Sequence, residues 1–361
     1  MTSLMSVRGL LPPHRYPQSK FADAVLAHRP DPFPVGPKTV SHAAVRRMMA
    51  NSGVQHRHTV QPLTDSLGLT SAARASRRQR EKIVEYGASA LAHALTDAGL
   101  RPDEVDLLVT TSSVAIGSPS WDLDVARLAG LRSDVQRLPL LELGCAGGVA
   151  LIARMHHHLK GNPGQIAVGV ASEAPTVLAG QSTNAFSRLV EWALYGDGSA
   201  AVVMAGADRC DPAAPLPRVV DTMSMQLPDS SGFTGWRIAE DGIETFLRPG
   251  LPALVEIFAP PAVERLLSRH ALTVDDVGVW ACHPGSALVI DGFAKGLSLA
   301  DDTMALSRSV LARNGNIFSA GTLHILADAI KTASPAGGWG VVAAFGPGIV
   351  AELVLLRWDG R

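Results

Sequence analysis

The sequence contains two copies of one pattern, and this repeat constrains the fold more than any other feature. The segment 100–111 has the same frame of apolar and acidic residues as the segment 272–283, at an offset of 172 residues. Further along, the stretch that begins with Gly144-Cys145 matches the stretch that begins with Gly315-Asn316, at an offset of 171 residues. Two matches at nearly one offset indicate a duplicated α/β unit rather than chance similarity.

The repeat also determines the expected domain organisation. A length of 361 residues suggests two or three domains, but two similar copies favour two halves that share one core. We expect these halves to be residues 1–210 and 211–361, because the proline-rich segment Asp208–Pro217 lies between the copies. Hydrophobic residues at 47% and charged residues at 18% suit a large α/β core.

Charge and cysteine content argue against several classes of protein. A formal net charge of −1 gives no reason to expect nucleic acid or an anionic membrane as a partner. Three cysteines provide no disulfide framework, so we expect a cytoplasmic protein with free thiols. The apolar stretch 338–356 is interrupted by Gly346-Pro347-Gly348, which indicates two strands rather than a membrane span.

Apolar periodicity predicts the main elements of both halves. The expected helices are Gln18–Ala27, Val40–Asn51, Arg80–Ala98, Asp122–Leu131, Cys145–Leu159, Pro252–His270, Ala287–Leu297 and Ala320–Thr332. The expected strands are Ser6–Pro12, Asp106–Thr111, Val135–Leu143, Gln165–Ser172 and Val277–Cys282, with closing strands from Gly340. Prolines dominate Arg29–Lys38 and polar residues dominate Asp65–Gln79, so we expect both segments to be loop or irregular structure.

Cys145 is the candidate nucleophile. It lies at a predicted strand-to-helix junction, where free N–H groups and the helix dipole stabilise a thiolate. Its small neighbours are expected to let a substrate approach the sulfur. A single cysteine in such a place is more often a buried structural residue. The repeat reverses that preference, because Asn316 begins the matching helix of the other half.

His283 is the candidate partner of the nucleophile. It follows the predicted strand Val277–Cys282, and its counterpart in the repeat, Thr111, also ends a strand. A single histidine there is more often a core or capping residue, but the repeat supports a site at the junction of the halves. We therefore predict that Cys145, His283 and Asn316 converge. No metal is expected at His156-His157-His158, because consecutive side chains point around a helix and zinc needs convergent ligands.

These residues lie in segments that resemble the signature segments of type III polyketide synthases, the chalcone-synthase-like enzymes of the thiolase superfamily. The segments are Leu143-Gly-Cys145, Trp280-Ala-Cys-His283-Pro-Gly-Ser, Asn314-Gly-Asn316-Ile-Phe-Ser-Ala and Ala344-Phe-Gly-Pro-Gly348. The N-terminal Pro-Pro-x-Arg-Tyr and the C-terminal Leu-Leu-Arg-Trp are closest in pattern to bacterial members that make alkylpyrones. The resemblance implies a duplicated, thiolase-like αβαβα architecture, with two similar halves, mixed sheets and buried central helices.

The resemblance also implies an iterative condensation. A Cys145 thiolate paired with protonated His283 takes the acyl group of an acyl-CoA starter. His283 and Asn316 then hold the thioester carbonyl of malonyl-CoA and stabilise the enolate left by decarboxylation. The enolate attacks the acyl group on Cys145, and repeated cycles end in ring closure to a pyrone or resorcinol. No cofactor is expected, because loss of CO₂ supplies the carbanion.

Two alternatives remain open at this point. The same Cys–His–Asn set occurs in ketoacyl-carrier-protein synthase III enzymes, so a single-condensation enzyme or acyltransferase is possible. His283-Pro-Gly and the Phe345-Gly-Pro-Gly loop favour the type III family instead. The other alternative is a catalytically silent binding partner, against which the intact Cys145, His283 and Asn316 argue.

The resemblance further implies a set of substrate-binding positions: Thr111, Ile116, Leu178, Tyr195, Thr245, Phe318 and Phe345. Phe318 stands where a serine is usual, and Tyr195 and Thr245 stand at the two gatekeeper positions. In a homodimer, Ile116 would reach the partner subunit's cavity. Arg47 aligns with a residue that meets CoA phosphates, whereas Ala44 and Asn51 replace two lysines, so an acyl carrier protein is an alternative donor.

Overall fold

The computed structural model describes the whole chain except residues 28, 36–37, 116, 181–185, 211–213, 240–241, 333–337 and 359–361. The helices of the described residues are α1 (Gln18–Leu26), α2 (His42–Ala50), α3 (Leu63–Gly68), α4 (Ala72–Asp97), α5 (Asp122–Leu128), α6 (Gly147–Gly161), α7 (Phe186–Leu194), α8 (Leu251–Ser268), α9 (Ala287–Gly296), α10 (Ala305–Asn314) and α11 (Phe318–Thr332). The strands are β1 (Thr2–Leu10), β2 (His14–Pro17), β3 (Phe33–Val35), β4 (Lys38–Val40), β5 (His56–Thr59), β6 (Leu107–Thr111), β7 (Gln136–Leu140), β8 (Ile166–Glu173), β9 (Gly198–Ala205), β10 (Pro217–Gln226), β11 (Thr234–Ala239), β12 (Gly242–Leu247), β13 (Val277–Cys282), β14 (Trp339–Gly346) and β15 (Val350–Trp358).

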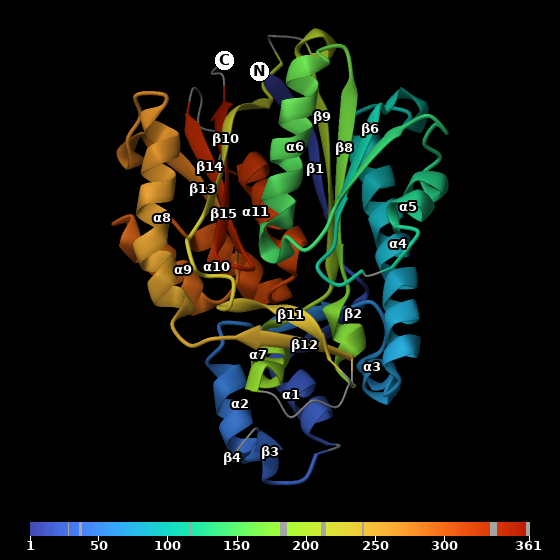
Figure 1. Cartoon of the computed structure of the whole chain (residues 1–361), viewed down its shortest axis with the longest axis vertical. Coiled ribbons are helices and arrows are strands. Elements are labelled where there is room, and N and C mark those ends of the chain that lie inside the picture. The colour runs from blue at the N-terminus through green and yellow to red at the C-terminus, as the bar shows by residue number, and fades with distance from the viewer. Residues whose placement is uncertain are drawn as a thin grey trace.

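The elements form five layers, as the resemblance implied (Figure 1). One sheet with the order β13-β14-β15-β10-β1-β9-β8-β6-β7 folds around the central helices α6 and α11. Helices α4 and α5 cover one outer face, and α8 and α9 cover the other. The predicted α/β fold with buried central helices is therefore confirmed.

The two halves have matching elements in matching order. The central helices α6 and α11 are both 15 residues long, and β8 and β14 are both 8 residues long. A short 3-10 helix with a capping box precedes β6 and another precedes β13. The halves meet where β1 pairs with β10 through only two residue pairs, Thr2 with Val219 and Ser3 with Arg218.

Side-chain alternation along the strands separates an inner core from two outer cores. In β14, Val342 and Ala344 face the inner core around the central helices, whereas Val341 and Ala343 face α8 and α9. Residues on both faces of a central strand are buried, so these strands are continuously apolar. The central helices approach closely because α6 starts with Gly147 and Gly148. A Cβ at Gly148 would lie 2.0 Å from the carbonyl oxygen of Ser319 in α11.

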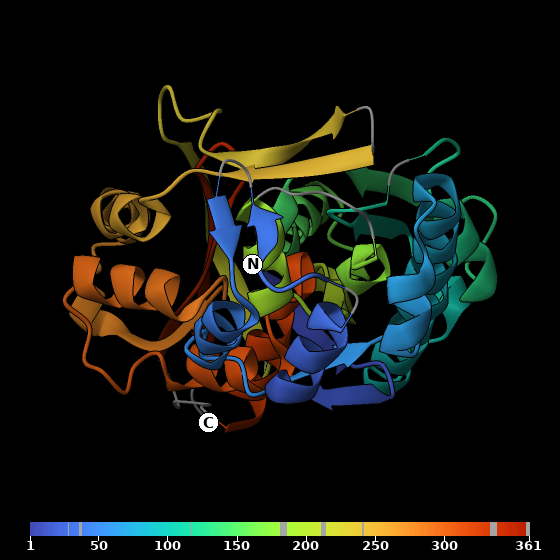
Figure 2. The same cartoon turned by 90° about the horizontal axis from the view of Figure 1, so that it is seen from below.

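Smaller elements form a cap at the end of the sandwich where α6 and α11 begin. Helices α1, α2, α3 and α7 and three two-stranded sheets make up this cap (Figure 1). Seen from below in Figure 2, α1 and α2 lie in front of the sandwich, and the hairpin β11–β12 crosses one side. The starts of the central helices therefore face the cap rather than solvent.

The sequence-based expectation of irregular structure over Asp65–Gln79 is wrong, because this segment contains the end of α3 and the first two turns of α4. Ser71 accepts a hydrogen bond from the Arg74 N–H and caps α4, so an exposed, basic first part of the helix is stable without apolar periodicity. Likewise, the expected loop Arg29–Lys38 contains β3 and the start of β4. The division at residue 210 stays a prediction, since residues 211–213 lie outside the described residues.

The described residues also bear on membrane insertion and on the three consecutive histidines. No helix among them is both long and apolar enough to cross a membrane. The three consecutive histidines bond in different directions: His156 to Thr2, His157 to Thr222 and His158 to Gln165, at 2.7–2.9 Å.

Candidate active site

Cys145 lies in a 3-10 turn, Gly144–Ala146, directly before α6. Gly144 has φ +51°, and a Cβ there would lie 2.5 Å from Pro347 Cδ in the loop after β14. A Cβ at Gly147 would lie 2.4 Å from Thr111 Oγ1. The small residues next to Cys145 thus allow protein segments of both halves to approach, and the expectation that they also let a substrate reach the sulfur stays a prediction.

Asn316 is held by the segment that follows α7. Its N–H donates to the Leu194 carbonyl at 2.7 Å, and its own carbonyl accepts from the Gly196 N–H at 3.1 Å. Its side-chain amide donates to the Gly285 carbonyl at 3.1 Å, and its Oδ1 accepts from the Phe318 N–H at 2.9 Å. A hydrogen bond from Asn316 to Cys145 opposes part of the rise in the cysteine pKa. The structure therefore brings Asn316 and Cys145 together, as predicted.

His283 lies immediately after β13 and is 3% exposed. Its backbone N–H donates to the Ala343 carbonyl at 2.8 Å, and its ring Nδ1 lies 3.4 Å from Thr322 Oγ1 on α11. Its Nε2 is buried and has no hydrogen-bond partner within the described part of the chain. The turn after His283 contains Gly285, which binds Asn316, so the histidine adjoins the Cys145–Asn316 pair. An unpartnered buried ring nitrogen is costly unless a substrate supplies its partner.

The charge state of this group differs from the sequence-based expectation. Burial and the nearby Glu173 carboxylate raise the pKa of Cys145 to about 12. Burial lowers the pKa of His283 to about 3. In the free protein, a neutral thiol and a neutral imidazole are therefore favoured over the expected thiolate–imidazolium pair. The helix start stabilises a thiolate less than loss of hydration destabilises it.

Glu173 is a site residue that sequence analysis did not find. It ends the buried strand β8 and is 1% exposed. Its carboxylate accepts hydrogen bonds from the Ser113 N–H at 3.0 Å and from the Ser113 hydroxyl at 2.9 Å. The Ser112 hydroxyl donates to it at 3.4 Å, and the Ser319 hydroxyl is a further donor. Burial nevertheless raises the pKa of Glu173 to about 7. Its sequence signal is a single acidic residue at the end of an apolar strand.

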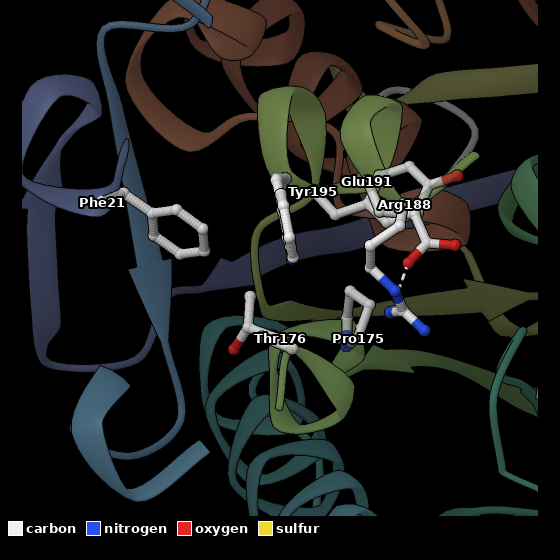
Figure 3. Close-up of a pocket in the computed structure, with 8 residues that line it drawn as sticks. Phe21, Pro175, Thr176, Arg188, Glu191 and Tyr195 are labelled. Atoms are coloured by element: carbon white, nitrogen blue, oxygen red, sulfur yellow. Dashed lines mark hydrogen bonds and ion pairs between the residues drawn. The ribbon is translucent and has the colours of Figure 1, made fainter. Parts of the chain in front are cut away.

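A pocket lies between α1, α7 and the 3-10 helix Pro175–Leu178, and we call it the α7 pocket (Figure 3). Its lining includes Phe21, Pro175, Thr176, Arg188, Glu191 and Tyr195. The Tyr195 ring packs on the Phe318 ring with 4.4 Å between centroids, so Tyr195 connects this pocket with the residue two positions after Asn316. Thr245 of β12 donates a hydrogen bond to Glu191 and so adjoins the pocket.

Three other predicted binding residues do not line this pocket or lie outside the described residues. Phe345 faces the outer core, where its ring packs on Phe258 and Phe293 at 6.4 and 6.1 Å between centroids. Its assignment to the substrate site is wrong, because strand alternation turns residue 345 away from the inner side. Thr111 is 1% exposed and packs on Gly147, two residues from Cys145, and its role in substrate binding stays a prediction. Ile116 lies outside the described residues.

The remaining two positions are Leu178 and Arg47. Leu178 is half-buried at the end of its 3-10 helix, and its carbonyl lies 3.5 Å from Arg188 Nη1. Arg47 is exposed on α2, where its neighbour Arg46 pairs with Asp23 at 3.1 Å. An exposed cation on the cap is compatible with phosphate binding, and the role of Arg47 stays a prediction.

A duplicated α/β sandwich with a cysteine, a histidine and an asparagine at the junction of its halves is typical of thiolase-like condensing enzymes. The chain belongs to the chalcone and stilbene synthase family: the model for the N-terminal domain of these enzymes matches residues 2–209, and the model for the C-terminal domain matches residues 218–358. It is thus a type III polyketide synthase, as the resemblance indicated, and not a ketoacyl-carrier-protein synthase III.

Individual relatives agree with this assignment. The chain is 36% identical over 358 residues to 1,3,6,8-tetrahydroxynaphthalene synthase of Streptomyces peucetius subsp. caesius, covering 99% of this chain and 93% of the relative. It is 28% identical over 320 residues to the enzyme of the same name from Streptomyces griseus, covering 87% and 83%. The solved structure of the Streptomyces coelicolor A3(2) tetrahydroxynaphthalene synthase has the same fold, with a TM-score of 0.88, 24% identity and coverage of 99% and 100%.

Proposed function

We propose that Cys145, His283 and Asn316 perform the iterative malonyl-CoA condensation that is general in this family. The observation that carries this assignment is the buried Nε2 of His283, which has no hydrogen-bond partner among the described residues and lies beside the Cys145–Asn316 hydrogen bond. A thioester oxygen in this place would give Nε2 a partner. Nε2 accepts the Cys145 proton in the first step, and the N–H formed in this way then donates to the thioester oxygen.

The first step is transfer of the starter acyl group. The Cys145 proton passes to Nε2 of His283 as the sulfur bonds to the thioester carbon, and the CoA thiolate leaves and takes a proton from water. Burial disfavours the separated charges, so the transfer occurs together with attack rather than before it. This order follows from the neutral resting pair and requires no stable thiolate.

The second step is extension. Donors on His283 and Asn316 hold the thioester oxygen of malonyl-CoA while its carboxylate leaves as CO₂, and the electron pair remains on the enolate. The enolate carbon attacks the acyl carbon on Cys145, whose sulfur leaves. Loss of CO₂ supplies the carbanion, so the proposal uses no metal or organic cofactor. CoA is the proposed donor carrier, with an acyl carrier protein as the alternative.

Ring closure releases the product. The predicted products are a pyrone or a resorcinol, and the name of the Streptomyces peucetius relative adds a polyhydroxylated naphthalene. The deciding experiment is incubation with malonyl-CoA alone and with a panel of acyl-CoA starters, followed by mass spectrometry of the products and of the intact protein. An acyl group on any residue other than Cys145, or product formation by Cys145→Ala, would contradict the proposal.

We also propose a cytoplasmic homodimer. The three cysteines are free thiols, which suits a reducing compartment. Strand β7 is an edge of the large sheet, and exposed leucines lie on it and on the neighbouring segments: Leu123, Leu128, Leu138 and Leu141. A sheet edge with exposed leucines on it and beside it is a candidate for contact with a second copy. Light scattering should give twice the chain mass, and Leu138→Arg should lower it; a monomeric wild type would reject the dimer.

A further inference from the structure

The α7 pocket contains a buried ion pair. Arg188 Nη1 lies 2.5 Å from Glu191 Oε2, and the two side chains are only 8% and 12% exposed. They are one turn apart on α7, and Figure 3 shows the guanidinium beside Pro175 with the carboxylate above it. Charged pairs this far from water are uncommon unless they have a role, because their hydration is lost.

The ion pair links α7 to two neighbouring elements, β12 and the 3-10 helix Pro175–Leu178. Glu191 accepts a hydrogen bond from Thr245 of β12, and Arg188 Nη1 lies 3.5 Å from the Leu178 carbonyl. A second cation lies nearby: the charge of Arg188 contributes to lowering the pKa of Arg29, whose guanidinium lies 5.2 Å from the centroid of the pocket residue Trp192. Two cations and one carboxylate of the described residues therefore lie together in this region.

The pocket adjoins the proposed nucleophile across one side chain. Tyr195 lines the pocket, and its ring packs on Phe318, which follows Asn316 by two residues. Besides burial, the charges of Glu191 and Cys145 raise the pKa of Tyr195, so this ring is near both the carboxylate and the sulfur. A chain that grows from Cys145 past Tyr195 therefore meets the ion pair.

The chemistry of such a wall distinguishes acyl chains. An alkyl chain would cover the charges without offering any hydrogen bond, which is unfavourable. The keto and enol oxygens of a polyketide chain can accept from a guanidinium or donate to a carboxylate. A terminal carboxylate, such as the one a malonyl starter carries, can also accept hydrogen bonds from a guanidinium.

We infer that the Arg188–Glu191 pair is a specificity determinant that admits short, oxygen-rich acyl chains with a malonyl starter and rejects long alkyl starters. This inference rests on the proposed function, in which Cys145 carries the chain. It opposes the likeness of the chain termini to alkylpyrone-forming members.

The test measures kcat/KM with malonyl-CoA as the only substrate and with dodecanoyl-CoA plus malonyl-CoA. The wild type should prefer malonyl-CoA alone. The double variant Arg188→Met/Glu191→Leu keeps the bulk but removes both charges, and it should raise the dodecanoyl-to-malonyl ratio about 10-fold or more. The matched control is Lys82→Met/Glu85→Leu, which removes an ion pair of the same spacing on α4 and should leave the ratio unchanged.

A wild type that uses dodecanoyl-CoA as well as malonyl-CoA, or a folded double variant with an unchanged ratio, would overturn the inference. Should the double variant not fold, Thr245→Val decides: it removes only the hydroxyl that binds Glu191, and a raised ratio supports the inference whereas an unchanged ratio rejects it. Intact-protein mass spectrometry separates the two proposals. If no donor places an acyl group on Cys145, the proposed function has failed, not merely the specificity of the pocket.

Discussion

At the scale of single residues, the main consequence of burial is that the nucleophile is neutral at rest. The Cys145 thiol has lost hydration and lies near the Glu173 carboxylate, and both effects oppose its ionisation. His283 is equally unable to hold a proton in the free protein. A substrate thioester must therefore supply the hydrogen-bond partner and the polarity that make proton transfer favourable. Reactivity toward a substrate and reactivity toward a small alkylating agent need not agree.

Alkylation rates test this electrostatic account. Iodoacetamide should modify Cys145 slowly at pH 7, and Glu173→Gln should speed the reaction, because each unit by which the thiol pKa falls raises the thiolate fraction about 10-fold. The rate of Cys145 alkylation is measured by peptide mass spectrometry on samples taken at successive times. Glu352→Gln, which replaces another buried carboxylate on β15, is the control and should have no effect. Faster labelling of Cys282, whose pKa burial also raises, would contradict the assignment of the nucleophile.

Asn316 should separate decarboxylation from acylation. Asn316→Ala removes the proposed donor to the malonyl thioester and should reduce CO₂ release about 10²–10³-fold, while Cys145 is still acylated by a starter. Asn316→Asp is the informative companion, because it keeps the acceptor for the Phe318 N–H but cannot donate to the Gly285 carbonyl. Release of CO₂ is followed with labelled malonyl-CoA. Normal release by Asn316→Ala would remove this residue from the mechanism.

At the scale of elements, the first residue of α11 connects the backbone of the site with its cavity. Phe318 has φ +45°, a left-handed conformation that costs a non-glycine residue about 1 kcal/mol or more, and its ring is only half-buried. The N–H bonds to Asn316 while the ring packs on Tyr195. The structure therefore favours a cavity position for Phe318 over one in the core beneath α11.

Replacing this ring should change the product rather than the fold. Phe318→Ser should open space beside Tyr195 and give longer chains or another ring closure, with acylation of Cys145 little affected. The loss of stability should be less than the roughly 2–4 kcal/mol typical of a large-to-small change in a core. Product masses and the melting temperature of this one variant are sufficient. An unaltered product profile with a large thermal loss would show that Phe318 is a core residue.

Periodicity and repetition made most elements predictable. The strand Val277–Cys282 and the central helices follow from them, since long apolar segments give a clear signal. The first part of α4 has an exposed, basic surface, so its sequence does not show the apolar periodicity that would have predicted a helix. Phe345 was wrongly assigned to the substrate site, because a sequence motif does not show which face of a strand a side chain is on. Glu173 and the Arg188–Glu191 pair were missed, since only the fold brings their partners together.

At the scale of the whole molecule, Glu173 connects the two halves. It ends β8 of the first half, and its carboxylate accepts from Ser113 of the same half and from Ser319 of α11 in the second. The direct sheet connection between the halves is short, consisting of two residue pairs between β1 and β10. Contacts through the inner core and this carboxylate therefore have a large part in fixing the starts of α6 and α11, on which the site depends.

The stability of the molecule should accordingly depend on the protonation of this carboxylate. Its pKa is raised from 4.5 to about 7 in the folded state, so the folded chain keeps a proton that the unfolded chain has lost. The contribution of Glu173 is therefore fully present below about pH 4.5 and is lost as the pH rises to about 7. Glu173→Gln has no such dependence. The free energy of unfolding, measured in urea at pH 5 and pH 8, should fall with pH in the wild type relative to this variant, by an amount on the order of 2–3 kcal/mol. Asp197 and His283 titrate in both proteins, so their contributions cancel in the difference between the free energies of unfolding of the wild type and the variant. A constant difference between the two proteins across this range would show that the carboxylate titrates normally and is not desolvated at the junction of the halves.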